Sequence, residues 1–182
     1  NKEEPLVLSR QDAYIGVMID DIVTKGISEP YRLLSSRAEY RLLLRHDNAD
    51  LRLTEIGHKL GTISAKRYNL FIKKNKLIKE TLSILQTTRF GQKSSVNKYL
   101  KQLGFDQLNA GVTALDLLRR PTVTLNALSA YIPSIEKLKL SEVAINQIEI
   151  MVKYEGYIKK QEKEAHEFAK LDNTLIPPNI DY

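Results

Sequence analysis

Residues 141–171 read SEVAINQIEIMVKYEGYIKKQEKEAHEFAKL and carry the longest helical pattern in the chain. Ser141 is expected to cap the start, because a serine side chain can accept a hydrogen bond from a backbone N–H of the first turn. Residues then recur along one face at alternating intervals of three and four: Met151, Tyr154, Ile158, Gln161, Ala165 and Phe168. Such a seam is typical of a helix that packs lengthwise against another helix.

The expected partner is a second long helix over residues 65–87. Ser64 stands at its capping position, and its apolar stripe is formed by Leu70 or Phe71, Leu77 or Ile78, Leu82 and Leu85. We expect the two long helices to form an antiparallel pair. The fold class is therefore predicted to be mainly α.

Shorter helices are predicted from capping residues and from the glycines and prolines that end helices. One is expected near 10–25, with Ser9 as its N-cap and Gly26 at its end. The run Leu42-Leu43-Leu44 favours another over 31–45, which would place Arg37, Arg41 and Arg45 on one face, although a strand would do the same. Further helices are expected to open at Thr54, Ser95, Thr113 and Thr124. Gly156, inside the longest helix, is interpreted as a point where another backbone comes close.

The composition excludes several kinds of chemistry. The 182 residues include no cysteine, which removes disulfides, thiolate nucleophiles and cysteine-based zinc sites. The three histidines lack metal-binding spacing, and no apolar run approaches the ~20 residues that span a bilayer. The start of the chain has no signal-peptide pattern and no initiating methionine. We therefore expect a piece of a longer cytoplasmic protein that does not enter a membrane.

The net charge of +6 is concentrated in the middle of the chain. Residues 1–53 hold 8 Lys or Arg against 9 Asp or Glu, and residues 106–182 hold 9 against 11. Residues 54–105 hold 11 against 2. A segment this basic either attracts nucleic acid or an anionic membrane, or is a solvated helix face.

Five arginines are candidate ligands for RNA phosphates: Arg32, Arg37, Arg41, Arg45 and Arg52. The guanidinium fork suits phosphate, but it suits carboxylate equally. Acidic residues of the same segment offer that alternative: Asp20, Asp21, Glu39, Asp47 and Asp50. Both readings stay open, and different arginines can take different roles. Asp20 and Asp21 point ~100° apart on a helix, so salt bridges are favoured over paired acid–base catalysis.

Several motifs, in order along the chain, resemble one enzyme family: AYIGV at 13–17 with DD at 20–21, EPYR at 29–32, SRAEYRL at 36–42, DNADLRLT at 47–54, LLRRP at 117–121, KYEGYI at 153–158 and IDY at 180–182. They are similar to the C-terminal part of the large subunit of the tRNA uridine 5-carboxymethylaminomethyl modification enzyme. This is the MnmG family, formerly called glucose-inhibited division protein A. The resemblance runs from about residue 8 to 182, and nothing is carried over for 86–112.

The resemblance implies an FAD-dependent parent enzyme that modifies the wobble uridine of tRNA. FAD would lie in an N-terminal Rossmann-like domain, with NADH and folate as co-substrates and a GTPase of the MnmE family as partner. The parent is expected to be a homodimer. A polyanionic substrate favours RNA backbone contact, rather than a merely solvated face, for six basic residues: Lys66, Arg67, Lys73, Lys74, Lys76 and Lys79.

The chain departs from the family by omission. It has no GxGxxG phosphate cradle and no cysteine, and it stops before the final helical module thought to dock the GTPase. We therefore expect no catalytic, cofactor-binding or metal-binding residue here, inactivity in isolation, and impaired GTPase docking. Residues 1–53 are assigned to the end of the FAD domain and its junction, and 54–182 to a helical C-terminal domain. The alternative is a free-standing basic helical adaptor that binds RNA or protein.

Overall fold

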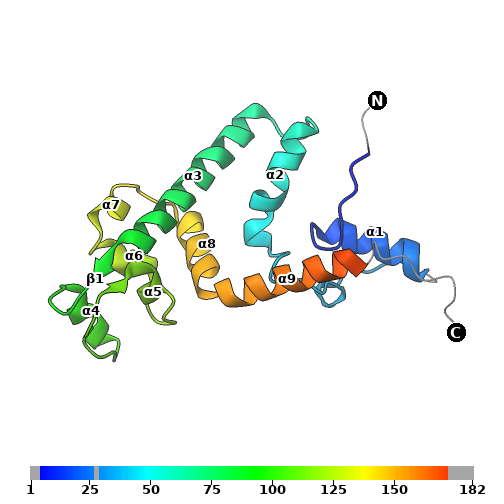
Figure 1. Cartoon of the computed structure of the whole chain (residues 1–182). Coiled ribbons are helices and arrows are strands. Elements are labelled where there is room, and N and C mark those ends of the chain that lie inside the picture. Colours follow the sequence, from blue (N-terminus) through cyan, green and yellow to red (C-terminus); the bar gives the residue numbers. More distant parts are fainter. Residues whose placement is uncertain (1–4, 27–28, 172–182) are drawn as a thin grey trace, which may run out of the picture. The chain divides into compact units, whose positions relative to one another are not determined.

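The computed structural model describes residues 5–26 and 29–171, which form helices and one small two-stranded sheet (Figure 1). This confirms the mainly α fold. The described residues divide into two compact units. Unit 1 combines the described parts of 1–49 and 156–182, and unit 2 is Asp50–Glu155.

Unit 2 is built along the long helix α3 (Ala65–Thr87). The predicted cap is confirmed, since Ser64 Oγ accepts a hydrogen bond from the backbone N–H of Arg67 at 3.4 Å. Phe71, Ile78 and Leu85 are buried on one face, as the apolar stripe predicted. Helix α2 (Ala49–Lys59) precedes α3 and begins earlier than the predicted Thr54. Of the turn expected over 47–50, Asp47 and Asn48 lie in a separate 3-10 turn, whereas Ala49 and Asp50 already belong to α2, and Asp50 in its first turn favours the helix electrostatically.

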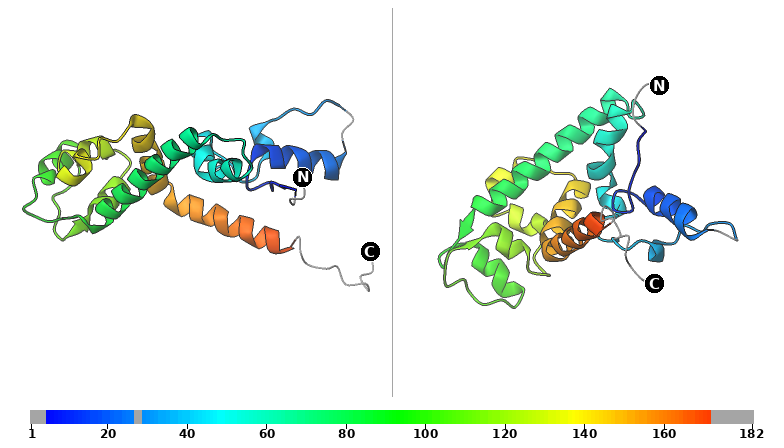
Figure 2. Two further views of the ribbon diagram at one scale, coloured as in Figure 1. Left: turned by 90° about the horizontal axis from the view of Figure 1, so that it is seen from above. Right: turned by 45° about the vertical axis from the view of Figure 1, so that its right-hand side comes forward.

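Shorter elements gather around the C-terminal half of α3, as the two views of Figure 2 also show. They are β1 (Arg89–Phe90), α4 (Val96–Gln102), β2 (Val112–Thr113), α5 (Ala114–Leu118), α6 (Leu125–Ser129) and α7 (Pro133–Glu136). The strands pair antiparallel, with Arg89 opposite Thr113. The predicted caps Thr113 and Thr124 are confirmed, because each hydroxyl accepts a backbone N–H of the helix it opens. Leu100, Leu117 and Leu128 are fully buried in the shared core.

Helix α8 (Glu142–Lys153) closes the core of unit 2. Ser141 caps it as predicted, and α8 contacts α3, so this part of the predicted helix pair is confirmed. The single helix over 141–171 is wrong, because the chain leaves helical geometry at Tyr154 and α9 (Glu155–Leu171) follows in unit 1. The close backbone approach predicted at Gly156 is also wrong: a Cβ there would meet nothing within 4 Å. Gly156, two residues after Tyr154, instead lowers the helix propensity close to the break.

Unit 1 contains α1 (Tyr14–Lys25), which ends at Gly26 as predicted, with φ 64°. Ser9 is not the N-cap. Its backbone N–H donates to Asp12 Oδ2 at 2.8 Å in a separate turn before the helix, so α1 starts later than expected. Gly16 lies against this turn, and a Cβ on Gly16 would come within 2.1 Å of the carbonyl oxygen of Ser9. The tight contact fixes the Ser9 turn on α1.

The helix predicted over 31–45 is wrong. The segment contains the 3-10 turn η1 (Ser35–Arg37), and a second turn, η2 (His46–Asn48), follows. Distant side chains occupy the backbone groups that a helix would use for itself. The carbonyl of Arg37 accepts from Arg10, while Gln161 accepts from the N–H of Leu42 at 3.1 Å and donates to the carbonyl of Glu39 at 3.4 Å. Gln161, predicted to lie in the helix seam, therefore hydrogen-bonds to the backbone of residues 39–42 in unit 1.

Candidate nucleic-acid interface

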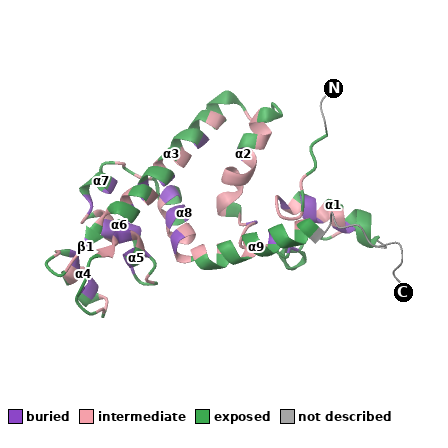
Figure 3. Cartoon of the chain, viewed as in Figure 1, coloured by how far each residue is buried: buried purple, intermediate pink, exposed green. Residues whose placement is uncertain are grey.

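The outer face of α3 carries the basic residues that the sequence singled out. Lys73, Lys76 and Lys79 are exposed, as are Lys66 and Arg67 near the start of the helix. Burial of Phe71, Ile78 and Leu85 turns Lys73 and Lys76 toward solvent, whereas Arg67, one turn before Phe71, is exposed on the side of the buried stripe. The N-terminal half of α3 is accordingly drawn mostly as exposed in Figure 3, and buried residues gather where α5, α6 and α8 meet.

Lys74 differs from its neighbours, because it is half-buried and bonds to Asp50 Oδ2 at 2.7 Å. It ties α3 to the start of α2. The exposed lysines border a shallow, open depression lined by Ile72, Asn75, Lys76, Lys79 and Glu80. Glu80 is the only acidic residue in that lining. A convex, mainly cationic face with a shallow hollow suits a phosphate backbone better than a small molecule, which requires enclosure.

The predicted arginines of unit 1 differ in how they are paired. Arg37 lies 3.8 Å from the carboxylate of Asp21 and stacks over the ring of Tyr31, with 4.7 Å to the ring centroid. Arg45 pairs with Asp47 at 3.0 Å and also donates to the carbonyl of Leu42. Their internal pairing, left open by the sequence, is thus observed.

Arg32 and Arg41 are exposed, and within the described part of the chain neither makes an ion pair with an acidic side chain. Arg52 is half-buried in α2. Of the five candidate arginines, Arg32 and Arg41 therefore present the most accessible charge. A guanidinium without a carboxylate partner keeps its donors for an incoming phosphate.

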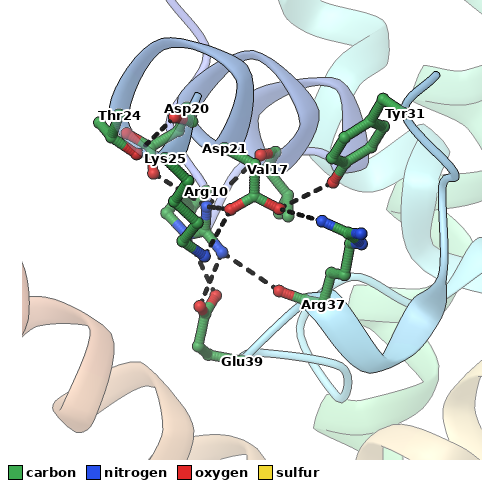
Figure 4. A network of polar contacts seen from close by, with 9 residues as sticks. All are labelled: Arg10, Val17, Asp20, Asp21, Thr24, Lys25, Tyr31, Arg37 and Glu39. Atoms are coloured by element: carbon green, nitrogen blue, oxygen red, sulfur yellow. Dashed lines mark hydrogen bonds and ion pairs between the residues drawn. The ribbon is translucent and has the colours of Figure 1, made fainter. Parts of the chain in front are cut away.

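A polar network holds the arginine segment against α1, and its centre, Arg10, was missed by sequence reasoning (Figure 4). The Arg10 guanidinium donates to Asp20 and Asp21 at 2.8 Å and to Glu39 at 2.7 Å. It also donates to the carbonyl of Arg37 at 3.1 Å. No local pattern signals this role, because the partners lie 10 to 29 residues away in sequence.

Asp21 is the buried acid of this network. Lys25, Arg10 and the hydroxyl of Tyr31 each donate to it at 2.8 Å, and together they hold the pKa of Asp21 well below its usual range. Burial, together with the bond to Asp21, raises the pKa of Tyr31. Glu39 and Asp21 in turn raise the pKa of Arg10. Asp20 and Asp21 both pair with Arg10 at 2.8 Å, which confirms the interpretation of these two residues as salt-bridge partners.

The described residues contain no group of three or more His, Asp or Glu side chains that could hold a metal ion. Nor do they assemble a phosphate cradle for a flavin, because Gly16 lies inside α1 with the carbonyl of Ser9 filling the space beside it. Among residues 5–26 and 29–171, no helix is sufficiently long and apolar to cross a membrane. What the described surface offers is cationic contact.

The fold and its surface define a class: a mainly helical domain with a basic outer face. The family described as "tRNA modifying enzyme MnmG/GidA C-terminal helical domain" matches residues 65–162. This chain belongs to the MnmG/GidA family.

Similarity to individual members extends over nearly the whole chain. The tRNA uridine 5-carboxymethylaminomethyl modification enzyme MnmG of Listeria innocua is 51% identical over 181 residues, and that of Geobacillus thermodenitrificans is 51% identical over 179. The chain spans 28% of the length of each. The crystal structure of Aquifex aeolicus GidA (form II) superposes with a TM-score of 0.71 at 36% identity, covering 99% of this chain and 28% of that one.

Proposed function

We propose that this chain is the tRNA-facing helical part of an enzyme that modifies the wobble uridine of tRNA. Two facts support the proposal. The relatives that match the chain over nearly its whole length are named as that enzyme, and α3 presents several exposed cations. The identity over 181 residues disfavours a free-standing adaptor. The parent enzyme would use FAD, NADH and folate, act in the cytoplasm as a homodimer, and work with a GTPase of the MnmE family.

In this proposal the chain supplies binding surface while the rest of the parent supplies the chemistry. Residues 1–53 would end the flavin domain, and 54–182 would form the helical C-terminal domain without its last module. The matched family region, residues 65–162, lies within the proposed helical domain. The isolated chain would be inactive, and its GTPase docking impaired.

The proposed RNA contacts are the exposed cations of α3 first, with Lys66, Arg67, Lys73, Lys76 and Lys79, and then Arg32 and Arg41. Arg37, Arg45, Arg52 and Lys74 would contribute charge at longer range, because Arg37, Arg45 and Lys74 are bonded internally and Arg52 is half-buried. Contacts of this kind bind the backbone without reading base sequence.

The test is an anisotropy titration of tRNA at several salt concentrations. The triple substitution Lys73→Glu, Lys76→Glu, Lys79→Glu should weaken binding and flatten the salt dependence, because fewer counterions are released. A matched control makes the same charge change on other exposed lysines of the same basic segment: Lys93→Glu, Lys98→Glu and Lys101→Glu. Equal losses in both variants, or none in the first, would show that α3 is a solvated face and not the RNA surface.

A further inference from the structure

An open groove in the surface of unit 1 has a volume of about 450 Å³. Its lining includes the apolar or aromatic side chains of Tyr14, Leu33 and Leu44 and the basic side chains of Arg41, Arg45 and His46. The volume falls within the ~300–1,000 Å³ that ligand sites occupy. A lining of apolar side chains and cations is the combination that a nucleotide needs, since its base is flat and its phosphate is anionic.

Arg41 is the cation of this groove that is free to meet a ligand. Arg45 is neutralised by Asp47, which also lines the groove, at 3.0 Å. Arg41 is exposed and has no carboxylate partner among the described residues. Of the apolar lining residues, Leu33 is 57% exposed although its side chain offers only hydrocarbon to water. Arg41, which has no carboxylate partner among the described residues, and the exposed Leu33 thus line the same groove.

We propose that this groove holds one nucleotide of a single-stranded RNA segment, with the phosphate at Arg41 and the base against Tyr14 and Leu33. The inference rests on the proposed function and deepens it, because it places a particular nucleotide contact in unit 1, apart from the backbone contacts of α3. An RNA strand is favoured over a free nucleotide because the groove is open. Small ligands are usually 70–90% buried when bound, whereas a strand is also held by its neighbouring nucleotides.

The Arg10 network explains why this groove can persist without a ligand. Its hydrogen bonds to Glu39 and to the carbonyl of Arg37 fix the chain just before Arg41, and Gln161 holds the N–H of Leu42 just after it. Arg41 is thereby anchored on both sides. A preformed site loses less conformational entropy when its ligand binds.

The test titrates the isotope-labelled chain with hexauridylate and follows backbone amide shifts by NMR. Amides of Leu33, Ser35 and His46 should shift. Arg41→Glu should abolish these shifts and weaken hexauridylate binding about fivefold, the effect of losing one solvent-exposed ion pair. Arg89→Glu, a matched control on an exposed arginine outside both the groove and the proposed RNA contacts, should leave them in place. Leu33→Ser should weaken binding, whereas Leu34→Ser, equally exposed but outside the lining, should not.

Three outcomes would overturn the inference. Uridine 5′-monophosphate shifting the groove amides as strongly as hexauridylate would make the groove a mononucleotide site. Shifts confined to α3 would leave the proposed tRNA surface standing and remove the groove from it. If neither hexauridylate nor tRNA binds, both proposals fail. Groove shifts that persist when Lys73, Lys76 and Lys79 are all changed to Glu, with tRNA binding unchanged, would support the groove and remove α3.

Discussion

At the scale of single residues, Asp21 shows how unit 1 stabilises a buried charge. Its pKa is lowered because Lys25, Arg10 and Tyr31 donate to it. A depressed pKa means that the unfolded chain binds the proton more readily, so ionised Asp21 stabilises the fold above its unfolded pKa of about 4. That contribution is lost as the pH falls below 4 through the folded-state pKa.

We expect Asp21→Asn to destabilise unit 1 by roughly 1–3 kcal/mol at neutral pH, because charged donors lose their acceptor. The variant should also flatten the loss of stability below about pH 4. Thermal melting followed by circular dichroism between pH 3 and 7 would measure both effects. Asp106→Asn, an exposed acid in unit 2, is the control. A variant that melts as wild type does across this range would show that Asp21 contributes nothing net.

Substitution of two glycines by alanine is expected to change the stability of the chain in opposite directions. Gly16→Ala should destabilise the chain by more than ~1 kcal/mol, since its Cβ would lie 2.1 Å from the carbonyl oxygen of Ser9, a backbone atom. Gly156→Ala should be neutral or should stabilise by up to ~1 kcal/mol, because its Cβ meets nothing and alanine favours a helix. Chemical denaturation measures the change in unfolding free energy of each variant. Equal changes in the two variants would contradict the contact at Gly16.

At the scale of elements, the contact between α3 and α8 is one of those that hold the core of unit 2 together. Ile148 on α8 is fully buried in the core, whereas Ile158 on α9 is half-buried. Ile148→Ala should cost about 2–5 kcal/mol of unfolding free energy, and Ile158→Ala clearly less. Urea denaturation measures both. If Ile158→Ala were the more damaging change, the continuous seam predicted over 141–171 would be right after all.

The elements that sequence predicted well are those with local signals. Each confirmed cap accepts a hydrogen bond from an N–H group only three residues away, as at Ser64, Thr113 and Ser141. Such caps can therefore be predicted from the local sequence. The segment 31–45 was predicted wrongly because its backbone is bonded to Arg10 and Gln161, up to 122 residues away. Tertiary bonds override helical preference there, and no local pattern reports them.

The same distinction holds for the candidate interface. The periodicity of α3 placed its lysines outward, because buried and exposed positions alternate with the helical repeat. It could not show that Lys74 bonds to Asp50, or that Arg37 and Arg45 are engaged while Arg41 is exposed. Which arginine is accessible depends on which carboxylates the fold brings near it. Arg10 binds three of these carboxylates, and no local sequence pattern indicates this role.

At the scale of the whole molecule, the chain should not hold a flavin. We expect it to purify colourless and to leave flavin fluorescence unquenched on titration with FAD, because the described residues lack a glycine-rich cradle for the pyrophosphate. Fluorescence titration at micromolar protein is the measurement. Stoichiometric binding would mean that the Tyr14–Lys25 helix forms far more of the cofactor site than proposed.

Unit 1 is assembled from both ends of the sequence, with all of unit 2 between them. During synthesis, unit 2 is complete as soon as Glu155 has left the ribosome and can fold while translation continues. The early segment of unit 1 must wait for Gln161 to emerge before its loop backbone finds its partner. Closing so long a loop is entropically easier once the intervening chain is compact, so the order of translation favours folding the inserted unit first.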